Sequence, residues 1–291
     1  MTEMTESARA YAFRRGWFRF RQSSLSMLGA VLVLAILVLA VIGPWIAPYP
    51  EHIVGGVDTA NRFQSPSLAH PFGTNELGQD VFSLVLAGTR ISVLAGLGVV
   101  LIGTIVGTLA GALAGFFGGW ADEVLMRLAD LKLTVPGLIL AMAVAAALGP
   151  GLMNMIIAIA LSWWPGYARL VRGEVIARKE EVYVTAARAI GASPSRVLFR
   201  HVLPNIVSPI VVKMSLDMGF AILTVASLGF IGIGVRPPTP EWGTLLSVSR
   251  SYMPDFWWTA VFPGLAMFVA IFGFNLLGDG LRDVLDPRAR R

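Results

Sequence analysis

The feature that most constrains this chain is a set of long stretches without a single charged residue. Residues 22–50, 91–121 and 133–168 contain no Asp, Glu, Lys or Arg. A helix that crosses the hydrocarbon core of a bilayer needs about 20 mostly apolar residues. Charged residues form only 14% of the chain, against about 25% in soluble domains. We therefore predict an all-α integral membrane protein.

These stretches divide into about six predicted spans. The third has 36 residues, too many for one crossing, and Gly149-Pro150-Gly151 is a turn signal that splits it in two. The first is longer than a signal-peptide core of about 7–15 residues and lacks a small-residue cleavage site, so we expect it to remain as an anchor. The predicted spans are 25–47, 91–121, the two halves of 133–168, 206–235 and 256–278.

Arg and Lys are distributed unevenly between the loops. They are frequent in the first 21 residues, in 169–200 and in 282–291, whereas the loops 48–87 and 236–256 together contain three. Loops rich in Arg and Lys favour the cytoplasmic side of a membrane. Six spans place all the basic segments on one side, so both termini are predicted to be cytoplasmic.

No catalytic or metal-binding constellation is visible. The chain has no Cys, its three His are scattered, and it has no Gly-x-Ser-x-Gly elbow. None of its three Lys follows a Gly, which excludes a Walker A phosphate loop. We expect no enzyme activity, metal or cofactor in this chain. We also expect no nucleic-acid partner, because the positive charge is spread over membrane-proximal loops.

Two charged residues, Lys213 and Asp217, lie well inside a predicted span. Residues four apart share one face of a helix and can form an ion pair. We favour a self-neutralising pair near the cytoplasmic end of the fifth span. The alternative is a pathway or coupling-ion site, as an ion-coupled secondary transporter would need.

The second span contains a glycine every fourth residue, at Gly103, Gly107, Gly111, Gly115 and Gly119. Small residues at this spacing allow two helix backbones to approach closely. We predict helix packing within the chain. A contact that slides or rotates during transport is the other interpretation.

Two polar segments lie on the predicted external side. "HPFGTNELGQDVFS" (70–83) opens with turn signals, and its Asp80 is placed to cap a short amphipathic helix from Val81. "GVRPPTPEWG" (234–243) contains three prolines and is predicted to be a stiff loop. Each segment is either a simple connection or a docking surface.

Residues 175–205 are predicted to form a helical hairpin on the cytoplasmic side. A helix over 175–190 would carry Val182, Ala186, Ala187 and Ile190 on one side. Gly191 fits the position that ends helices, and Ser193 and Pro194 fit the cap and first position of a new helix. Such a hairpin is suited to docking a soluble partner, although the same sequence pattern also fits a loop that lies on the membrane surface.

The hairpin resembles the "EAA" loop of binding-protein-dependent ABC permeases. That pattern is Glu-Ala-Ala, three residues, Gly, nine residues, Ile, one residue and Leu-Pro. This chain has Thr185-Ala186-Ala187, Gly191, His201 and Leu203-Pro204 at the same spacings. Thr185 replaces the Glu and His201 replaces the Ile. These departures remove the Glu carboxylate from the pattern and leave the spacing of the loop unchanged.

Three further segments look like hallmarks of the dipeptide, oligopeptide and nickel permease branch, specifically of its C-type subunit. They are 70–83, 234–243 and "FNLLGDGLRDVLDPR" at 274–288. With the hairpin, the resemblance extends over nearly the whole chain. It implies a type I ABC importer permease of a bacterial or archaeal cytoplasmic membrane, surrounded by lipid.

The resemblance also implies partners and cargo. The chain would pair with a homologous second permease, two ATPase subunits would dock on the EAA loop, and an external binding protein would deliver substrate. ATP and Mg²⁺ would be bound by the ATPases and not by this chain. Peptides are the expected cargo, with nickel, sugars, opines or glutathione-like compounds open. An ion-coupled secondary transporter is the alternative class.

The resemblance assigns residues and regions as follows. The ATPase-coupling residues would be Thr185, Ala186, Ala187, Arg188, Gly191, Ser193, Pro194, His201, Leu203 and Pro204. Binding-protein docking would involve Phe72, Gly73, Thr74, Pro237, Pro238, Pro240 and Trp242. The expected regions are a cytoplasmic tail (1–24), a first span with its external loop (25–87), a core permease domain (88–281) with the EAA loop at about 174–205, and a second tail (282–291).

Overall fold

The computed structural model describes residues 17, 18 and 20–285, and these residues form a helical bundle without a β-strand. Most of the basic residues of the two predicted tails lie outside the described residues. The long helices are α2 (Ser24–Ile46), α4 (Val81–Phe117), α5 (Gly119–Leu133), α6 (Gly137–Leu148), α7 (Leu152–Lys179), α10 (Val207–Ile231) and α12 (Trp258–Leu285). The short ones are α3 (Pro50–Ile53), a 3₁₀ turn (Thr59–Asn61), α8 (Val182–Ala189), α9 (Pro194–Arg196) and α11 (Trp242–Ser249).

Four of these helices, α2, α4, α10 and α12, are long and apolar enough to cross a membrane. A fifth crossing results if α5 and α6, which are bent by 91°, count together. The predicted number of six is reached only if α7 is added, and its second half is rich in Arg. The predicted turn at 149–151 does separate two helices, but α6 has only 12 residues, too few for a span of its own.

The predicted short helix from Val81 is wrong. Asp80 does cap a helix there, accepting a hydrogen bond from the Ser83 N–H at 2.8 Å, but α4 continues without a break for 37 residues. The glycines within α4 do not end the helix. Several of them face other helices at close range, so that α4 is held by packing along its length. The polar 70–80 segment is therefore built directly onto the longest helix of the bundle.

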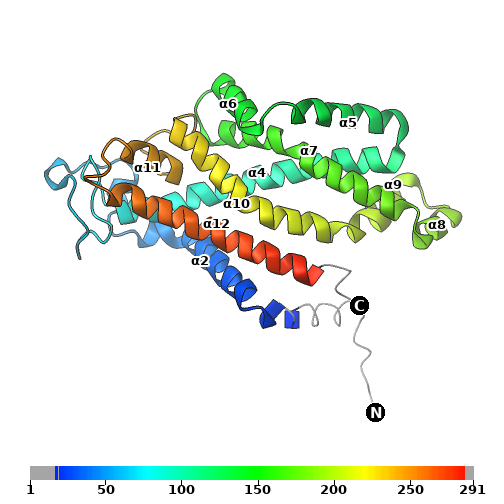
Figure 1. The fold of residues 1–291 in the computed structure, drawn as a ribbon, viewed down its shortest axis with the longest axis horizontal. Coiled ribbons are helices and arrows are strands. Elements are labelled where there is room, and N and C mark those ends of the chain that lie inside the picture. The colour runs from blue at the N-terminus through cyan, green and yellow to red at the C-terminus, as the bar shows by residue number, and fades with distance from the viewer. Residues whose placement is uncertain (1–16, 19, 286–291) are drawn as a thin grey trace, which may run out of the picture.

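Helix α4 runs through the middle of the bundle and packs along α7 (Figure 1). On its other sides it contacts α2 and α10, and α12 packs against both of these. Buried side chains from α4, α7 and α10, including Val99, Ile159 and Ile222, form one continuous core. The two ends of the bundle are therefore held by the same helices.

The predicted glycine series forms much of the contact between α4 and α7. A methyl group added at Gly111 would overlap the backbone of Ala168, and one at Gly115 would lie 2.8 Å from the Arg172 carbonyl oxygen. Gly103 and Gly107 also face α7, so the packing is within the chain. The prediction is wrong for Gly119, because α4 ends before it and an added methyl would contact nothing within 4 Å.

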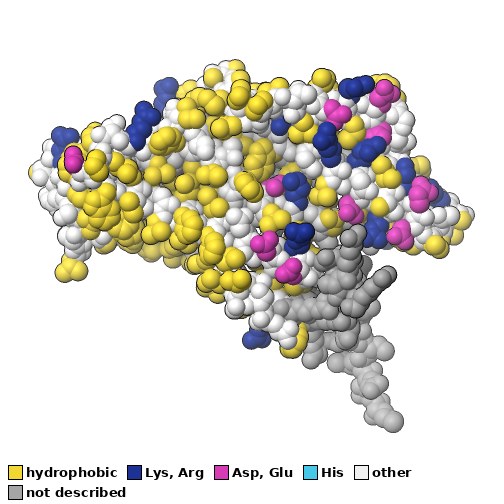
Figure 2. Space-filling model, viewed as in Figure 1, with side chains coloured by type: hydrophobic (Ala, Val, Ile, Leu, Met, Phe, Trp, Pro, Cys, Tyr) yellow, Lys and Arg dark blue, Asp and Glu magenta, His cyan; other side chains and the backbone are white. Residues whose placement is uncertain are grey.

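The long axis of the molecule has two different ends (Figure 1). The loop end is formed by 47–80, 232–241 and α11, and the hairpin end is formed by α8, α9 and the residues up to 206. Hydrophobic side chains cover the middle of the molecule, whereas Lys, Arg, Asp and Glu gather towards the hairpin end (Figure 2). This division agrees with an apolar band that faces lipid.

Candidate functional site

The hairpin has the predicted local geometry in its first half. Helix α8 ends at Ala189, and Gly191 follows with a φ of +85°, in the left-handed region that favours glycine. The Ser193 hydroxyl then accepts a hydrogen bond from the Arg196 N–H at 3.4 Å, with Pro194 in the first position of α9. The predicted helix end, cap and helix start are confirmed.

The second half of the hairpin is less regular than predicted. Helix α9 has three residues and passes into a π-helical turn (Val197–Val202) and a 3₁₀ turn (Leu203–Asn205) before α10 begins. Pro204 has no N–H to donate to the carbonyl group four residues earlier, which disfavours a regular α-helix at this point. The wider π-helical turn brings the chain into α10 instead.

One side of the hairpin packs on the bundle. Val184, Ala187 and Val197 are buried in a cluster with Val171 and Val175 of α7. This cluster also contains residues of α4 and α10. The hairpin is therefore a fixed extension of three long helices, and a displacement of it would be transmitted to all three.

The opposite side of the hairpin is an open apolar surface. Val182 and Ile190 are 84% and 86% exposed, and Ala186, between them, is exposed as well. Phe199 is also exposed. The predicted apolar side of this helix is therefore only partly packed, since of its four residues Ala187 alone is buried.

The predicted coupling residues divide in the same way. Thr185, Ala186, Arg188, Gly191, Ser193, Pro194 and Pro204 are exposed, His201 and Leu203 are half-buried, and Ala187 is buried. The Thr185 hydroxyl, which replaces the Glu of the family pattern, lies 3.5 Å from the Glu181 carbonyl oxygen of its own helix. It therefore does not extend from the helix as a Glu carboxylate would.

The loop end contains a buried polar network around Asp80. The Asp80 carboxylate accepts hydrogen bonds from the N–H and hydroxyl groups of Ser83, at 2.8 and 2.7 Å, and lies 2.9 Å from Nδ1 of His70. The Asp80 N–H donates to Nδ1 of His52 at 2.9 Å, so that nitrogen carries no proton. The Tyr49 ring stacks on the His52 ring. The network fixes residues 49–80 to the start of α4.

A second buried carboxylate, Glu241, joins α11 to α4. It accepts hydrogen bonds from the N–H groups of Gly243 and Thr244, at 2.8 and 2.9 Å, and from the Ser92 hydroxyl at 3.2 Å. Burial raises the pKa of the Glu241 carboxyl above its usual value. Sequence reasoning missed this residue, because Glu is not among the side chains that usually cap the start of a helix.

Several residues predicted to dock a binding protein are structural instead. Thr74 is fully buried, and its hydroxyl bonds to the Asn61 carbonyl and the Gln64 N–H. Trp242 is also buried, and its indole N–H donates to the Val85 carbonyl at 3.2 Å. For these residues the docking prediction is wrong.

The other predicted docking residues differ in their exposure to solvent. Gly73 and Pro240 are buried, whereas Phe72 is half-buried and stacks on Phe262 with ring centroids 4.0 Å apart. Pro237 and Pro238 are exposed. These two prolines are the part of the predicted surface that a partner could contact.

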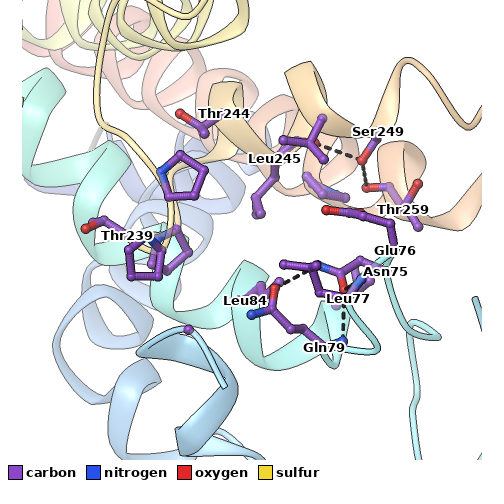
Figure 3. Close-up of a pocket in the computed structure, with 17 residues that line it drawn as sticks. Asn75, Glu76, Leu77, Gln79, Leu84, Thr239, Thr244, Leu245, Ser249 and Thr259 are labelled. Atoms are coloured by element: carbon purple, nitrogen blue, oxygen red, sulfur yellow. Dashed lines mark hydrogen bonds between the residues drawn. The ribbon is translucent and has the colours of Figure 1, made fainter. Parts of the chain in front are cut away.

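Pro237 and Pro238 line a cavity of about 330 Å³ at the loop end (Figure 3). Residues 75–79 form one wall, and Leu245 of α11 and Thr259 of α12 belong to the other. Burial raises the pKa of the Glu76 carboxyl in this wall. The lining of the cavity is mainly apolar, and its Pro237 and Pro238 are exposed.

No group of three or more His, Asp or Glu side chains that could hold a metal ion occurs among the residues that the structure describes. The predicted pairing of Lys213 with Asp217 is confirmed, with Nζ 3.0 Å from a carboxylate oxygen. Further ion pairs join α5 to α7, Asp122 with Arg172 and Asp130 with Arg169.

Comparisons with known proteins agree with this geometry. Residues 107–291 match the family described as binding-protein-dependent transport system inner membrane component, and residues 12–66 match the N-terminal TM domain of oligopeptide transport permease C. The glutathione transport system permease protein GsiD of Escherichia coli O6:K15:H31 is 46% identical over 274 residues, which are 94% of this chain and 90% of GsiD. GsiD of Shigella dysenteriae serotype 1 is 47% identical over the same shares.

A solved structure shows the same fold. A chain of the MetNI methionine ABC transporter, in inward-facing conformations, superposes with a TM-score of 0.53 at 16% identity. The match covers 69% of this chain and 96% of that one. The helical bundle, the two matched regions and the full-length relatives all lead to one conclusion: the chain belongs to the family of inner membrane components of binding-protein-dependent transport systems.

Proposed function

We propose that this chain is the C-type permease subunit of an ATP-driven importer of glutathione or short peptides. The observation that carries the proposal is the 46% identity to a glutathione permease over 94% of the chain. Similarity on that scale includes both ends of the bundle and every helix between them. A homologous second permease would complete the translocation path.

The hairpin end supports docking of separate ATPase subunits. Its exposed apolar residues Val182 and Ile190 project from a hairpin that is packed on α4, α7 and α10. An ATPase that closes on ATP would push this surface and move the three helices together. ATP and Mg²⁺ would be held by the ATPases, in agreement with the absent Walker A loop.

The loop end supports delivery of cargo by an external binding protein. Pro237 and Pro238 are exposed and line the cavity, on a scaffold held by buried hydrogen bonds. A rigid surface of this kind costs little conformational entropy when a partner binds. The ion-coupled secondary transporter is set aside, because family membership places the chain in binding-protein-dependent transport.

Uptake by vesicles that contain the purified complex tests the proposal. Labelled glutathione and a dipeptide should accumulate only when ATP and the loaded binding protein are both present. The control is a complex whose ATPase cannot hydrolyse ATP. Uptake that continues without ATP and stops when ion gradients are dissipated would show that the secondary-transporter interpretation was correct.

Sidedness is tested with single cysteines, since the chain has no Cys of its own. A Ser195→Cys variant in the hairpin should be shielded from an impermeant external thiol reagent. A Ser7→Cys variant in the basic tail should be shielded as well, whereas Ser67→Cys at the loop end should be labelled. External labelling at position 195 contradicts the proposed orientation.

A further inference from the structure

The ion pair of α10 lines a large cavity beside the hairpin end. The Lys213 and Asp217 side chains are 31% and 17% exposed, so the pair is open on one side. Asp217 is the eleventh of the 25 residues of α10, which places it roughly 15 Å along the helix. The cavity has a volume of about 940 Å³ and lies between α7, α10 and the end of α12.

The lining of this cavity contains charges of both signs. Glu174 and Arg178 of α7 and Arg282 of α12 join Lys213 and Asp217 on its wall. Ionisable side chains within a membrane protein almost always face the bundle interior or a water-filled cavity. The mixed charges indicate that this cavity holds water and is not covered by lipid tails.

Residues beside the pair keep the Lys213 ammonium both held and accessible. Nζ of Lys213 lies 4.9 Å from the centroid of the Tyr167 ring, a cation–π contact. The Tyr167 hydroxyl is buried and has no hydrogen-bond partner among the described residues. Gly166 lies next to Lys213, and a methyl group added there would be in ordinary contact with Nζ at 3.8 Å. The aromatic face orients the ammonium, while the part of the side chain that lines the cavity stays exposed.

We propose that Lys213 and Asp217 form a transit site for cargo that carries both an ammonium and a carboxylate group, as free peptides do. The inference rests on the proposed function and deepens it. The cargo carboxylate would bind the Lys213 ammonium, and the cargo ammonium would bind the Asp217 carboxylate. One ion pair in the wall would thus be exchanged for two across the cavity.

The pair is suited to transit because it neutralises itself before and after the cargo passes. A single unpaired charge at this depth would be costly and would hold an oppositely charged cargo strongly. A transport path needs a site that is favourable enough to enter and weak enough to leave. The pair satisfies both conditions, since Lys213 and Asp217 recombine at 3.0 Å when the cargo leaves.

The first experiment compares the amount of dipeptide taken up per ATP hydrolysed in reconstituted complexes. In Lys213→Gln/Asp217→Asn this ratio should fall about tenfold, because two charge-assisted hydrogen bonds to the cargo are lost. The exchanged variant Lys213→Asp/Asp217→Lys should recover most of it, since both charges remain. The matched control Asp130→Asn/Arg169→Gln removes an ion pair of 2.5 Å between α5 and α7, away from this cavity, and should keep the wild-type ratio.

The second experiment leaves the pair intact and needs no binding protein. Leu216→Cys places a thiol in the wall of the same cavity. A free dipeptide should slow its labelling by a charged thiol reagent, whereas the same dipeptide acetylated at one end and amidated at the other should not. This comparison holds even if one of the charge variants fails to assemble.

The outcomes separate the inference from the proposed function. Suppose that the wild-type complex shows ATP-dependent dipeptide uptake, and that Lys213→Gln/Asp217→Asn takes up as much dipeptide per ATP hydrolysed. The transit site is then refuted, and the proposed function is not. Equal protection of the Leu216→Cys thiol by the free and the blocked dipeptide refutes the transit site too. If the wild-type complex moves neither glutathione nor dipeptide, the proposed function fails and the inference fails with it.

Discussion

The loop end and the hairpin end contain short helices and turns of similar size, but they treat their side chains in opposite ways. At the loop end, the carboxylates Asp80 and Glu241 are fully buried and each accepts several hydrogen bonds. At the hairpin end, Val182 and Ile190 are apolar and largely exposed. The loop end contains buried carboxylates whose hydrogen bonds are made within the chain, whereas the hairpin end has no buried carboxylate of this kind among the described residues and exposes apolar side chains next to its turn.

This difference distinguishes buried polar groups that hold the fold together from exposed apolar groups that a partner can cover. Burial of a charged group is tolerated only when hydrogen bonds replace its water, so the loop end is a finished scaffold. Exposed apolar side chains outside the lipid-facing band indicate a surface that another molecule covers. Val182 and Ile190 mark such a surface on the hairpin, and the loop end has exposed apolar residues of its own, Val54 and Leu68, outside its buried network. The comparison predicts that mutations at the loop end affect stability and that mutations at the hairpin affect coupling.

The largest effect is expected at the glycine contact between α4 and α7, the helices that hold both ends of the bundle. Gly111→Leu forces a side chain into the backbone of Ala168 and should destabilise the fold by more than about 3 kcal/mol. The chain should not co-purify with its partners in detergent. Gly173→Leu, at a helical glycine without neighbours within 4 Å, is the matched control and should assemble. Normal yield of the Gly111 variant would show that α4 and α7 separate without cost.

Next in size is the loss of the Asp80 carboxylate. Asp80→Ala leaves the Ser83 and His70 donors buried without their acceptor and should cost about 3 kcal/mol. Thermal unfolding of the detergent-solubilised complex measures this loss. Asp255→Ala, at an exposed position of the same end, should unfold at the wild-type temperature. Equal behaviour of the two variants would mean that the buried network is not a scaffold.

The pH dependence of stability tests the second buried carboxylate. The pKa of Glu241 is raised in the folded state above its usual 4.5, so folding favours the protonated form. Its contribution to stability is therefore largest at low pH and is lost as pH rises through the raised pKa. Relative to Glu241→Gln, which does not titrate, the wild type should gain up to about 1.4 kcal/mol per pH unit on acidification towards 4.5. If the free energies of unfolding of the wild type and Glu241→Gln changed in parallel with pH, the charged form of Glu241 would not be disfavoured by folding.

At the hairpin, Gly191→Val should reduce stability less than the loop-end variants do, but it should reduce coupled transport more. A β-branched residue at a φ of +85° is strained by about 1–2 kcal/mol. The complex should still assemble, while cargo uptake per ATP hydrolysed falls. Gly191→Asn is the control, since Asn tolerates the left-handed conformation. Full coupling in the Val variant would mean that the turn does not transmit movement.

The smallest effect on stability is expected at Ile190, an exposed residue of the hairpin. Ile190→Ser should change the free energy of unfolding by less than about 0.5 kcal/mol. It should nevertheless weaken ATPase docking by about ten- to a hundredfold, because an isoleucine buried in an interface contributes about 1.5–3 kcal/mol. Val54→Ser, at a 76% exposed residue of the loop end, should leave docking unchanged. Identical ATPase affinity in both variants would remove the functional contrast between the ends.

The sequence by itself determined the features that depend on neighbouring residues. The apolar stretches predicted α2, α4, α10 and α12, and Gly191, Ser193 and Pro194 predicted the turn of the hairpin. A helix cap or a left-handed turn depends on hydrogen bonds that reach three or four positions along the chain. Such contacts can be read from residue types and spacing alone.

Only the tertiary structure decided which polar residues are buried and which apolar ones are not. The Ser92 hydroxyl reaches Glu241 across 149 positions of the chain, and the Trp258 indole N–H reaches the Thr74 carbonyl across 184. The second bond makes Thr74, a predicted docking residue, part of the scaffold, and packing on α7 left Ile190 rather than Ala187 exposed. Burial is a property of the assembled bundle, because it depends on which distant helix lies over a side chain.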